Sequence, residues 1–112
     1  MSLEITVSEM KRVHLIEVGG RVDSLSANEL GHSLAQIIDS GHHAMVIDLS
    51  NVEYMSSAGL REIVSALRRV QKTGGDIRVA NPSERVMEVL ELAGLDTIFK
   101  IYATQVEAVG SY

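Results

Sequence analysis

A buried strand that runs into a helix constrains the fold of this chain more than any other feature. The run Ala44–Leu49 is apolar except for Asp48. An apolar run of this length without alternation is typical of a strand covered on both faces. Apolar residues then recur with a helical period over residues 60–70. The chain is therefore predicted to pass from a buried strand into a helix through a loop that holds Ser56 and Ser57.

A loop of this kind lies where binding sites are common. In open sheets with parallel strands, ligands bind outside the carboxyl ends of the strands. The first turn of a helix also exposes unpaired amide hydrogens and the positive end of the helix dipole. A serine there can cap the helix, bind an anion or accept a phosphate. The residues by themselves leave these three roles open.

The rest of the chain predicts a small α/β fold with a mixed sheet. Alternation over residues 3–7, followed by apolar residues at positions 13, 15, 16 and 18, predicts an antiparallel hairpin around a polar turn at residues 9–12. Helical stripes then alternate with short strands, which favours parallel neighbours joined by right-handed crossovers. We expect the amino-terminal strand to lie antiparallel at an edge, helices packed against the sheet, and a single domain over residues 1–112.

Local patterns give more specific expectations. Ser26, with Glu29 three residues later, matches a capping box. At the start of a later helix, Asn81 is expected to be the cap. Pro82 is expected to occupy the first helical position, where no amide hydrogen is needed. Asp48, at the end of a strand, is expected to accept hydrogen bonds from loop amides rather than to contact a partner.

Composition excludes several classes of function. The chain has no cysteine, so thiolate metal sites, thiol catalysis and disulfides are excluded. A net charge of -5 and a single phenylalanine argue against nucleic-acid binding, which needs basic surface and often stacking aromatics. No stretch approaches the roughly 20 apolar residues of a membrane span, and the amino terminus lacks the pattern of a secretory signal. We expect a cytoplasmic protein with neither a nucleic-acid nor a membrane partner.

Positive charge is nevertheless clustered in one part of the sequence. Five basic residues have only two acids near them in the chain, namely Arg61, Arg68, Arg69, Lys72 and Arg78. Cations that complement the carboxyl end of a helix are the simpler explanation. A patch that binds a partner is the alternative.

A hydrolase fits these residues poorly. A nucleophile elbow has glycine two residues on either side of its serine, whereas Ser57 has Met55 and Gly59 at these positions. No histidine is well placed as a base for Ser57. His42 and His43 precede the central strand, at the edge opposite to Ser57, and lack other ligands at metal-binding spacing. The sequence therefore predicts no enzymatic activity, no cofactor and no metal.

The central block resembles the STAS domain, the fold of bacterial anti-sigma factor antagonists and of the cytoplasmic tail of sulphate transporters. The family has a strand followed by an Asp/Ser-Ser-small-Gly-Leu loop. The matching segments here are Val46-Ile47-Asp48-Leu49-Ser50 and Ser56-Ser57-Ala58-Gly59-Leu60, supported by Gly20-Arg21-Val22-Asp23 and by residues 93–99. The resemblance spans nearly the whole chain, and it implies a STAS-like fold.

The resemblance also implies a function. In the family, the second residue of the loop quintet is phosphorylated by a partner that is both anti-sigma factor and serine kinase, and this position is Ser57. The family often has Asp just before it, where this chain has Ser56. The expected role is an anti-sigma factor antagonist that is switched off by phosphorylation and reset by a serine phosphatase. The implied partner-binding residues are Asp23, Ser56, Ser57, Ala58, Gly59 and Arg61.

Two questions stay open at this point. Gly59 is explained equally well as space for internal packing and as room for a partner's backbone. The alternative function is a STAS subunit of a transport or signalling complex that uses the same surface without phosphorylation.

Overall fold

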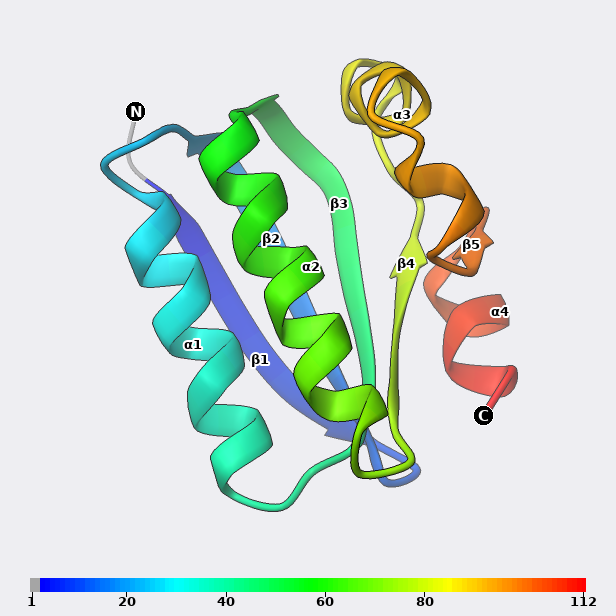
Figure 1. The fold of residues 1–112 in the computed structure, drawn as a ribbon. Coiled ribbons are helices and arrows are strands. Elements are labelled where there is room, and N and C mark those ends of the chain that lie inside the picture. Colours follow the sequence, from blue (N-terminus) through cyan, green and yellow to red (C-terminus); the bar gives the residue numbers. More distant parts are fainter. Residues whose placement is uncertain (1–2) are drawn as a thin grey trace.

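Five strands form one sheet in the computed structural model, which describes residues 3–112 (Figure 1). The sheet order is β1-β2-β3-β4-β5. β1 pairs antiparallel with β2, and all other neighbours are parallel. The predicted mixed sheet with an antiparallel amino-terminal hairpin is therefore confirmed. The strands are β1 (Glu4–Met10), β2 (Val13–Val22), β3 (Ala44–Met55), β4 (Asp76–Ala80) and β5 (Ile101–Tyr102).

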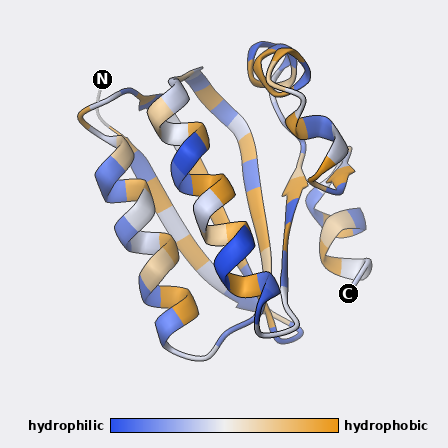
Figure 2. Cartoon of the chain, in the orientation of Figure 1, coloured by the Kyte–Doolittle hydropathy of each residue, from blue (hydrophilic) through white to orange (hydrophobic). Residues whose placement is uncertain are grey.

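Helices lie on both faces of this sheet. One face packs against the first three helices, and the other packs against the last one. Figure 2 shows hydrophilic and hydrophobic residues alternating around the long helices, as expected where one side of a helix is buried. The helices are α1 (Ala27–Asp39), α2 (Ser57–Gln71), α3 (Glu84–Leu92), the short 3-10 helix η1 (Leu95–Thr97) and α4 (Gln105–Gly110).

The start of β3 is buried from both sides. Met45 and Ile47 belong to the large hydrophobic cluster beneath α1, α2 and α3. Val46, between them, belongs to the smaller cluster beneath α4. All three residues have no exposed surface. The prediction that this apolar run is a strand covered on both faces is confirmed, and the strand continues beyond it to Met55.

The β1–β2 turn is tighter than the sequence predicts. Pairing continues through Glu9, opposite His14, so that only Lys11 and Arg12 form the turn. Their φ angles of 51° and 70° are both in the left-handed region. A two-residue turn with positive φ matches the twist of a hairpin, which allows the strands to pair up to the turn. Glu9 is therefore a strand residue and not part of the expected polar turn at residues 9–12.

Two of the predicted caps are wrong. Ser26 precedes α1, but its side chain makes no capping hydrogen bond. Its Oγ instead accepts from the amide of Asp23 at 2.9 Å. Asn81 adopts a left-handed φ of 47°, which asparagine tolerates better than most residues. The cap of α3 is Ser83, so Pro82 lies outside the helix.

Asp48 accepts a hydrogen bond from an amide of β3 and another from a side chain of α4. It is 96% buried, with a relative exposure of 4%. One carboxylate oxygen accepts from the amide of Ser50 at 2.8 Å, and the other accepts from the side chain of Gln105 at 2.6 Å. Asp48 therefore accepts a hydrogen bond from a backbone amide, as expected, although this amide lies within β3 and not in a loop.

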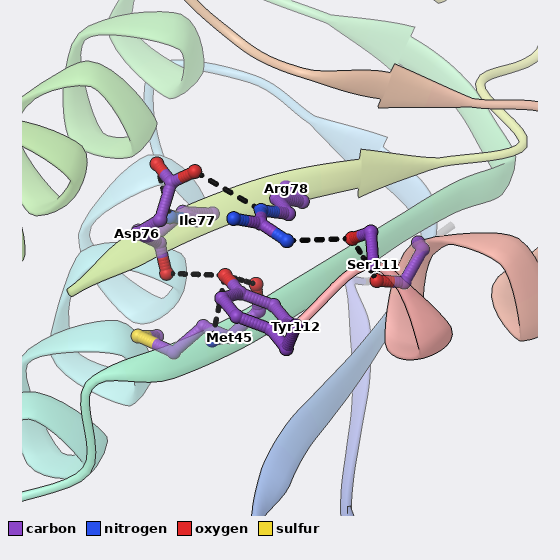
Figure 3. Close-up of polar contacts among 7 residues, drawn as sticks. Met45, Asp76, Ile77, Arg78, Ser111 and Tyr112 are labelled. Atoms are coloured by element: carbon purple, nitrogen blue, oxygen red, sulfur yellow. Dashed lines mark hydrogen bonds and ion pairs between the residues drawn. The ribbon is translucent and has the colours of Figure 1, made fainter.

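The carboxyl-terminal residues Ser111 and Tyr112 form hydrogen bonds with residues near the start of β3 and β4 (Figure 3). The Tyr112 hydroxyl lies 2.7 Å from the carbonyl oxygens of Met45 and Asp76 and accepts from the Met45 amide at 3.1 Å. Arg78 stacks over the Tyr112 ring, with 3.8 Å from its guanidinium carbon to the ring centroid. It also donates to Asp76 at 3.1 Å and to Ser111 at 2.7 Å. Burial raises the pKa of Tyr112 to about 12, which keeps this hydroxyl protonated.

Candidate functional site

The loop between β3 and α2 is anchored through Ser56. Its amide donates to the carbonyl of Val22 at 2.7 Å, which fastens the loop to the end of β2. Its Oγ accepts from the amide of Gly59 at 3.1 Å, and its carbonyl accepts from Leu60 at 3.0 Å. Ser56 is therefore the N-cap of α2, and its hydroxyl is committed to the helix.

Ser57 has a different environment from its neighbour. It is the first residue of α2 and is exposed. Its hydroxyl makes no hydrogen bond with any residue in the described part of the chain, whereas the Ser56 hydroxyl accepts the capping bond. Of the three roles that the sequence left open for a serine here, the cap is taken by Ser56. Ser57 presents a free hydroxyl at the positive end of a helix.

A second loop, between β2 and α1, lies beside this helix start (Figure 1). Asp23 follows Val22 directly, and its Oδ1 accepts from the amides of Leu25 at 3.0 Å and Ser26 at 2.9 Å. These hydrogen bonds, the one from the Ser26 amide foremost, hold the pKa of Asp23 below its usual value. The loop therefore carries a fixed negative charge near the start of α2.

Leu25 is a surface feature that the sequence analysis did not single out. It is 86% exposed, at the tip of the loop that Asp23 organises. Single exposed apolar side chains are common on protein surfaces, so Leu25 is of interest only for its place beside Asp23. The available signal was an apolar residue within the polar turn Asp23-Ser24-Leu25-Ser26.

Gly59 faces the interior of the protein. A Cβ atom at this position would lie 2.6 Å from Val22 Cγ1 and 2.7 Å from Met55 Sδ. The residue is buried, so it allows α2 to pack closely on the ends of β2 and β3. Of the two explanations that the sequence left open, these contacts support internal packing, and a contact between Gly59 and a partner stays a prediction.

The remaining candidate residues lie on the first turns of α2. Ala58 is half-buried, and Arg61 is exposed. Arg61 is four residues after Ser57, so the two side chains share one face of the helix. The structure thus brings Ser57, Arg61 and the Asp23 loop to the same end of the sheet.

Most of the basic cluster has structural partners. Arg68 and Arg69 lie in the last turn of α2, where cations complement the helix dipole. Arg69 pairs with Asp39 of α1, and Arg78 pairs with Asp76. The simpler explanation of this cluster, complementation of a helix end, holds for Arg68 and Arg69.

Three of the four histidines lie at the end of the sheet away from Ser57. His14 pairs with Met45 near the start of β3, whereas Ser57 follows the end of that strand. The His14 and His42 rings lie together, with centroids 3.8 Å apart. His43 Nδ1 lies 2.9 Å from the Thr73 hydroxyl, at the same end. The structure therefore assembles no base beside Ser57 from these three histidines.

Comparison with known proteins identifies the family. The family model described as "STAS domain" matches residues 4–108. The chain belongs to the STAS domain family. This STAS domain is 29% identical, over 103 residues, to the anti-sigma-B factor antagonist of Bacillus subtilis, covering 92% of this chain and 94% of that protein.

Solved structures agree with this assignment. An anti-sigma factor antagonist from Mycobacterium paratuberculosis superimposes with a TM-score of 0.90 at 27% identity, covering 98% of this STAS domain and 93% of that chain. The Bacillus protein SpoIIAA in its phosphorylated form superimposes with a TM-score of 0.78 at 19% identity, covering 96% and 98%. At that identity the likeness to SpoIIAA shows a shared fold. Among the described residues, no helix is long and apolar enough to cross a membrane.

Proposed function

We propose that this STAS domain is an anti-sigma factor antagonist whose binding to an anti-sigma factor with serine kinase activity is switched off by phosphorylation of Ser57. The observation that carries the proposal is the difference between the two adjacent serines at the start of α2. Ser56 supplies the cap, so Ser57 is left exposed with an unbonded hydroxyl. The relatives named as anti-sigma factor antagonists support the partner class.

The partner surface is centred on the exposed residues around Ser57. Arg61 offers a cation on the same helix face, and Asp23 offers a fixed anion on the neighbouring loop. Leu25 adds an apolar side chain that would be buried by a partner. A surface of this mixed character suits a protein partner of complementary charge around an apolar contact.

Phosphorylation would act on this surface and leave the fold intact. A phosphoryl group adds a charge of roughly -1.5 to -2 at neutral pH. At the first position of α2 that charge is stabilised by the helix dipole and the free amides. SpoIIAA, a protein of the same fold, has been solved in a phosphorylated form, which supports the tolerance of this fold for the modification.

The interface itself would lose affinity. A contact shaped for a hydroxyl would have to bury a dianion, and removing that charge from water is costly. Each ~1.4 kcal/mol of that cost weakens binding about tenfold. A serine phosphatase that removes the phosphate would restore the antagonist.

The test uses the kinase and anti-sigma partner of the same organism. Wild type, Ser57→Ala and Ser57→Asp are titrated into the partner by calorimetry, and phosphate is mapped by mass spectrometry after incubation with ATP. We expect Ser57→Ala to bind like wild type and to resist phosphorylation. We expect Ser57→Asp to bind at least about tenfold more weakly.

Ser65→Asp is the matched control, because Ser65 is also an exposed serine of α2. This variant should bind within about twofold of wild type, since its charge lies two turns away from Ser57. Phosphate on Ser56 or on another residue would contradict the assignment. No phosphate on any residue, with binding of a transport or signalling complex instead, would favour the STAS subunit that works without phosphorylation.

A further inference from the structure

Three potential metal ligands meet at the end of the sheet opposite to Ser57. Glu9 of β1 and His14 of β2 are directly paired in the hairpin, and His42 lies in the loop between α1 and β3. His14 Nε2 lies 4.0 Å from a Glu9 carboxylate oxygen. One donor atom from each of the three residues lies within 4.8 Å of the others.

His14 faces this cluster through Nε2, the ring nitrogen that lies 4.0 Å from the Glu9 carboxylate. Its side chain is only 12% exposed, so the imidazole is largely shielded from water by the surrounding protein. The other ring nitrogen, Nδ1, is buried without a hydrogen-bond partner in the part of the chain that the structure describes. In a neutral imidazole one nitrogen carries the proton, so a proton on Nδ1 would leave the Nε2 lone pair facing Glu9 and His42.

We propose that Glu9, His14 and His42 form a binding site for a divalent transition-metal ion, with Zn²⁺ as the best match. Two imidazoles and one carboxylate are a ligand set that zinc accepts, with water in the fourth position. Nitrogen donors favour zinc over magnesium and calcium, which prefer oxygen. The carboxylate of Glu9 offsets part of the charge of the ion.

The site requires a closure and a rotation of the two imidazoles, whose rings lie face to face with centroids 3.8 Å apart and 33° between their planes. Zinc binds these atoms at ~2.1 Å, so tetrahedral ligand atoms lie about 3.4 Å apart. The ligand atoms would have to approach by up to about 1.4 Å from their present separation of up to 4.8 Å. Glu9 can supply much of this movement because its side chain is 60% exposed, and His42 lies in a loop.

Zinc binding would join the β1–β2 hairpin to the loop that precedes β3. Because these elements lie at the far end of the sheet from Ser57, the site is independent of the proposed phosphorylation switch. The expected consequence is a higher melting temperature of the whole domain in the presence of zinc.

Calorimetry on the chelator-treated, untagged protein tests the proposal with Zn²⁺ as the probe and Mg²⁺ as the comparison. We expect one zinc ion per chain and no detectable Mg²⁺ binding. Glu9→Gln and His42→Gln should each weaken zinc binding at least about tenfold. Replacement of bound zinc by Co²⁺ should give the visible absorption bands of a tetrahedral site.

His43→Gln and His32→Gln are the matched controls, since both residues are exposed histidines outside the cluster. Both should bind zinc like wild type. Thermal melts in the presence of chelator report whether each variant folds. If His42→Gln does not fold, the zinc affinity of Glu9→Gln decides the test. Wild type that binds no zinc, zinc affinity unchanged in both Glu9→Gln and His42→Gln, or loss of binding in His43→Gln would overturn the proposal.

Discussion

Helices α2 and α3 begin in almost the same way, and only one of them presents a free hydroxyl. Each is preceded by a serine in an extended conformation, Ser56 and Ser83. Each serine accepts from the amide three residues ahead, Gly59 at 3.1 Å and Val86 at 3.3 Å. The comparison shows that a capping serine at a helix start is structural by default.

The difference lies at the next position. α3 continues with Glu84, an acid in its first turn, whereas α2 continues with the exposed Ser57. Glu84 shows that a helix start in this protein accommodates a negative charge at the first position. A phosphate on Ser57 would give α2 the kind of charge that α3 already carries. The fold is therefore expected to tolerate a modification that changes the surface.

The largest effect is expected from enlarging Gly59, which holds the start of α2 on the sheet. In Gly59→Ala the new methyl group would meet the side chains of Val22 and Met55 at less than 3 Å, so these side chains or the start of α2 must shift. Overpacking of this kind costs about 1–3 kcal/mol. Chemical denaturation of purified Gly59→Ala should show a loss of this size in the free energy of unfolding.

Gly31→Ala is the matched control within another helix. A Cβ atom there would meet only the carboxylate end of Glu62, a side chain that can turn away. Alanine inside a helix should then stabilise the protein by roughly 0.5–1 kcal/mol. Equal stability of the two variants would mean that α2 does not depend on close packing at Gly59.

Removing the two caps tests the similarity of the helix starts directly. Ser56→Ala and Ser83→Ala should each cost about 1 kcal/mol of stability. Ser83→Ala should cost more, because its hydroxyl also donates to the Val52 carbonyl at 3.1 Å. Denaturant titrations measure both losses. A Ser56→Ala variant as stable as wild type would show that Ser57 can take over the cap. That result would contradict the claim that the Ser57 hydroxyl plays no part in capping α2.

The hydrophobic pattern of the sequence predicted the central strand correctly, because burial on both faces is encoded in the uninterrupted apolar residues of that strand. Val46 and Ile47 face opposite clusters, as the uninterrupted apolar run implied. The caps were harder to predict. Asn81 and Ser83 both suit a cap by composition, and the left-handed backbone at Asn81 decides between them. At Ser26, the hydrogen bonds with the Asp23 loop replace the expected capping box.

The candidate site was only partly accessible from the sequence. The motif pointed to the start of α2, but it did not separate the capping role of Ser56 from the free hydroxyl of Ser57. The inward position of Gly59 depends on how closely α2 approaches two strands. The meeting of Glu9 and His14 depends on the hairpin register, which a turn expected at residues 9–12 concealed. Such features come from tertiary geometry and leave no signal in local pattern.

A smaller effect is expected from charge at the two helix starts. Ser57→Asp should be more stable than Ser57→Ala by ~0.3–1 kcal/mol, because the helix dipole favours an acid. Glu84→Gln should lose a similar amount at α3. Thermal melts at low ionic strength measure both differences. An Asp variant that melts below the Ala variant would mean that α2, unlike α3, does not accept an anion, and that phosphorylation would act by unfolding.

The smallest effect concerns Asp23, whose loop lies beside the start of α2. Its pKa is lowered from 3.8 in the folded state, chiefly by the hydrogen bond from the Ser26 amide. A lowered carboxyl pKa adds stability above the unfolded value, and that stability is lost as the pH falls through the folded value. Asp23→Asn keeps an oxygen acceptor and removes the charge, so wild type should be slightly more stable near neutral pH and should converge with the variant below pH 3.8. Denaturant titrations across this range measure the convergence. A constant difference at every pH would assign the effect to the shape of the side chain, and the fixed negative charge proposed for the partner surface beside Ser57 would then have no support.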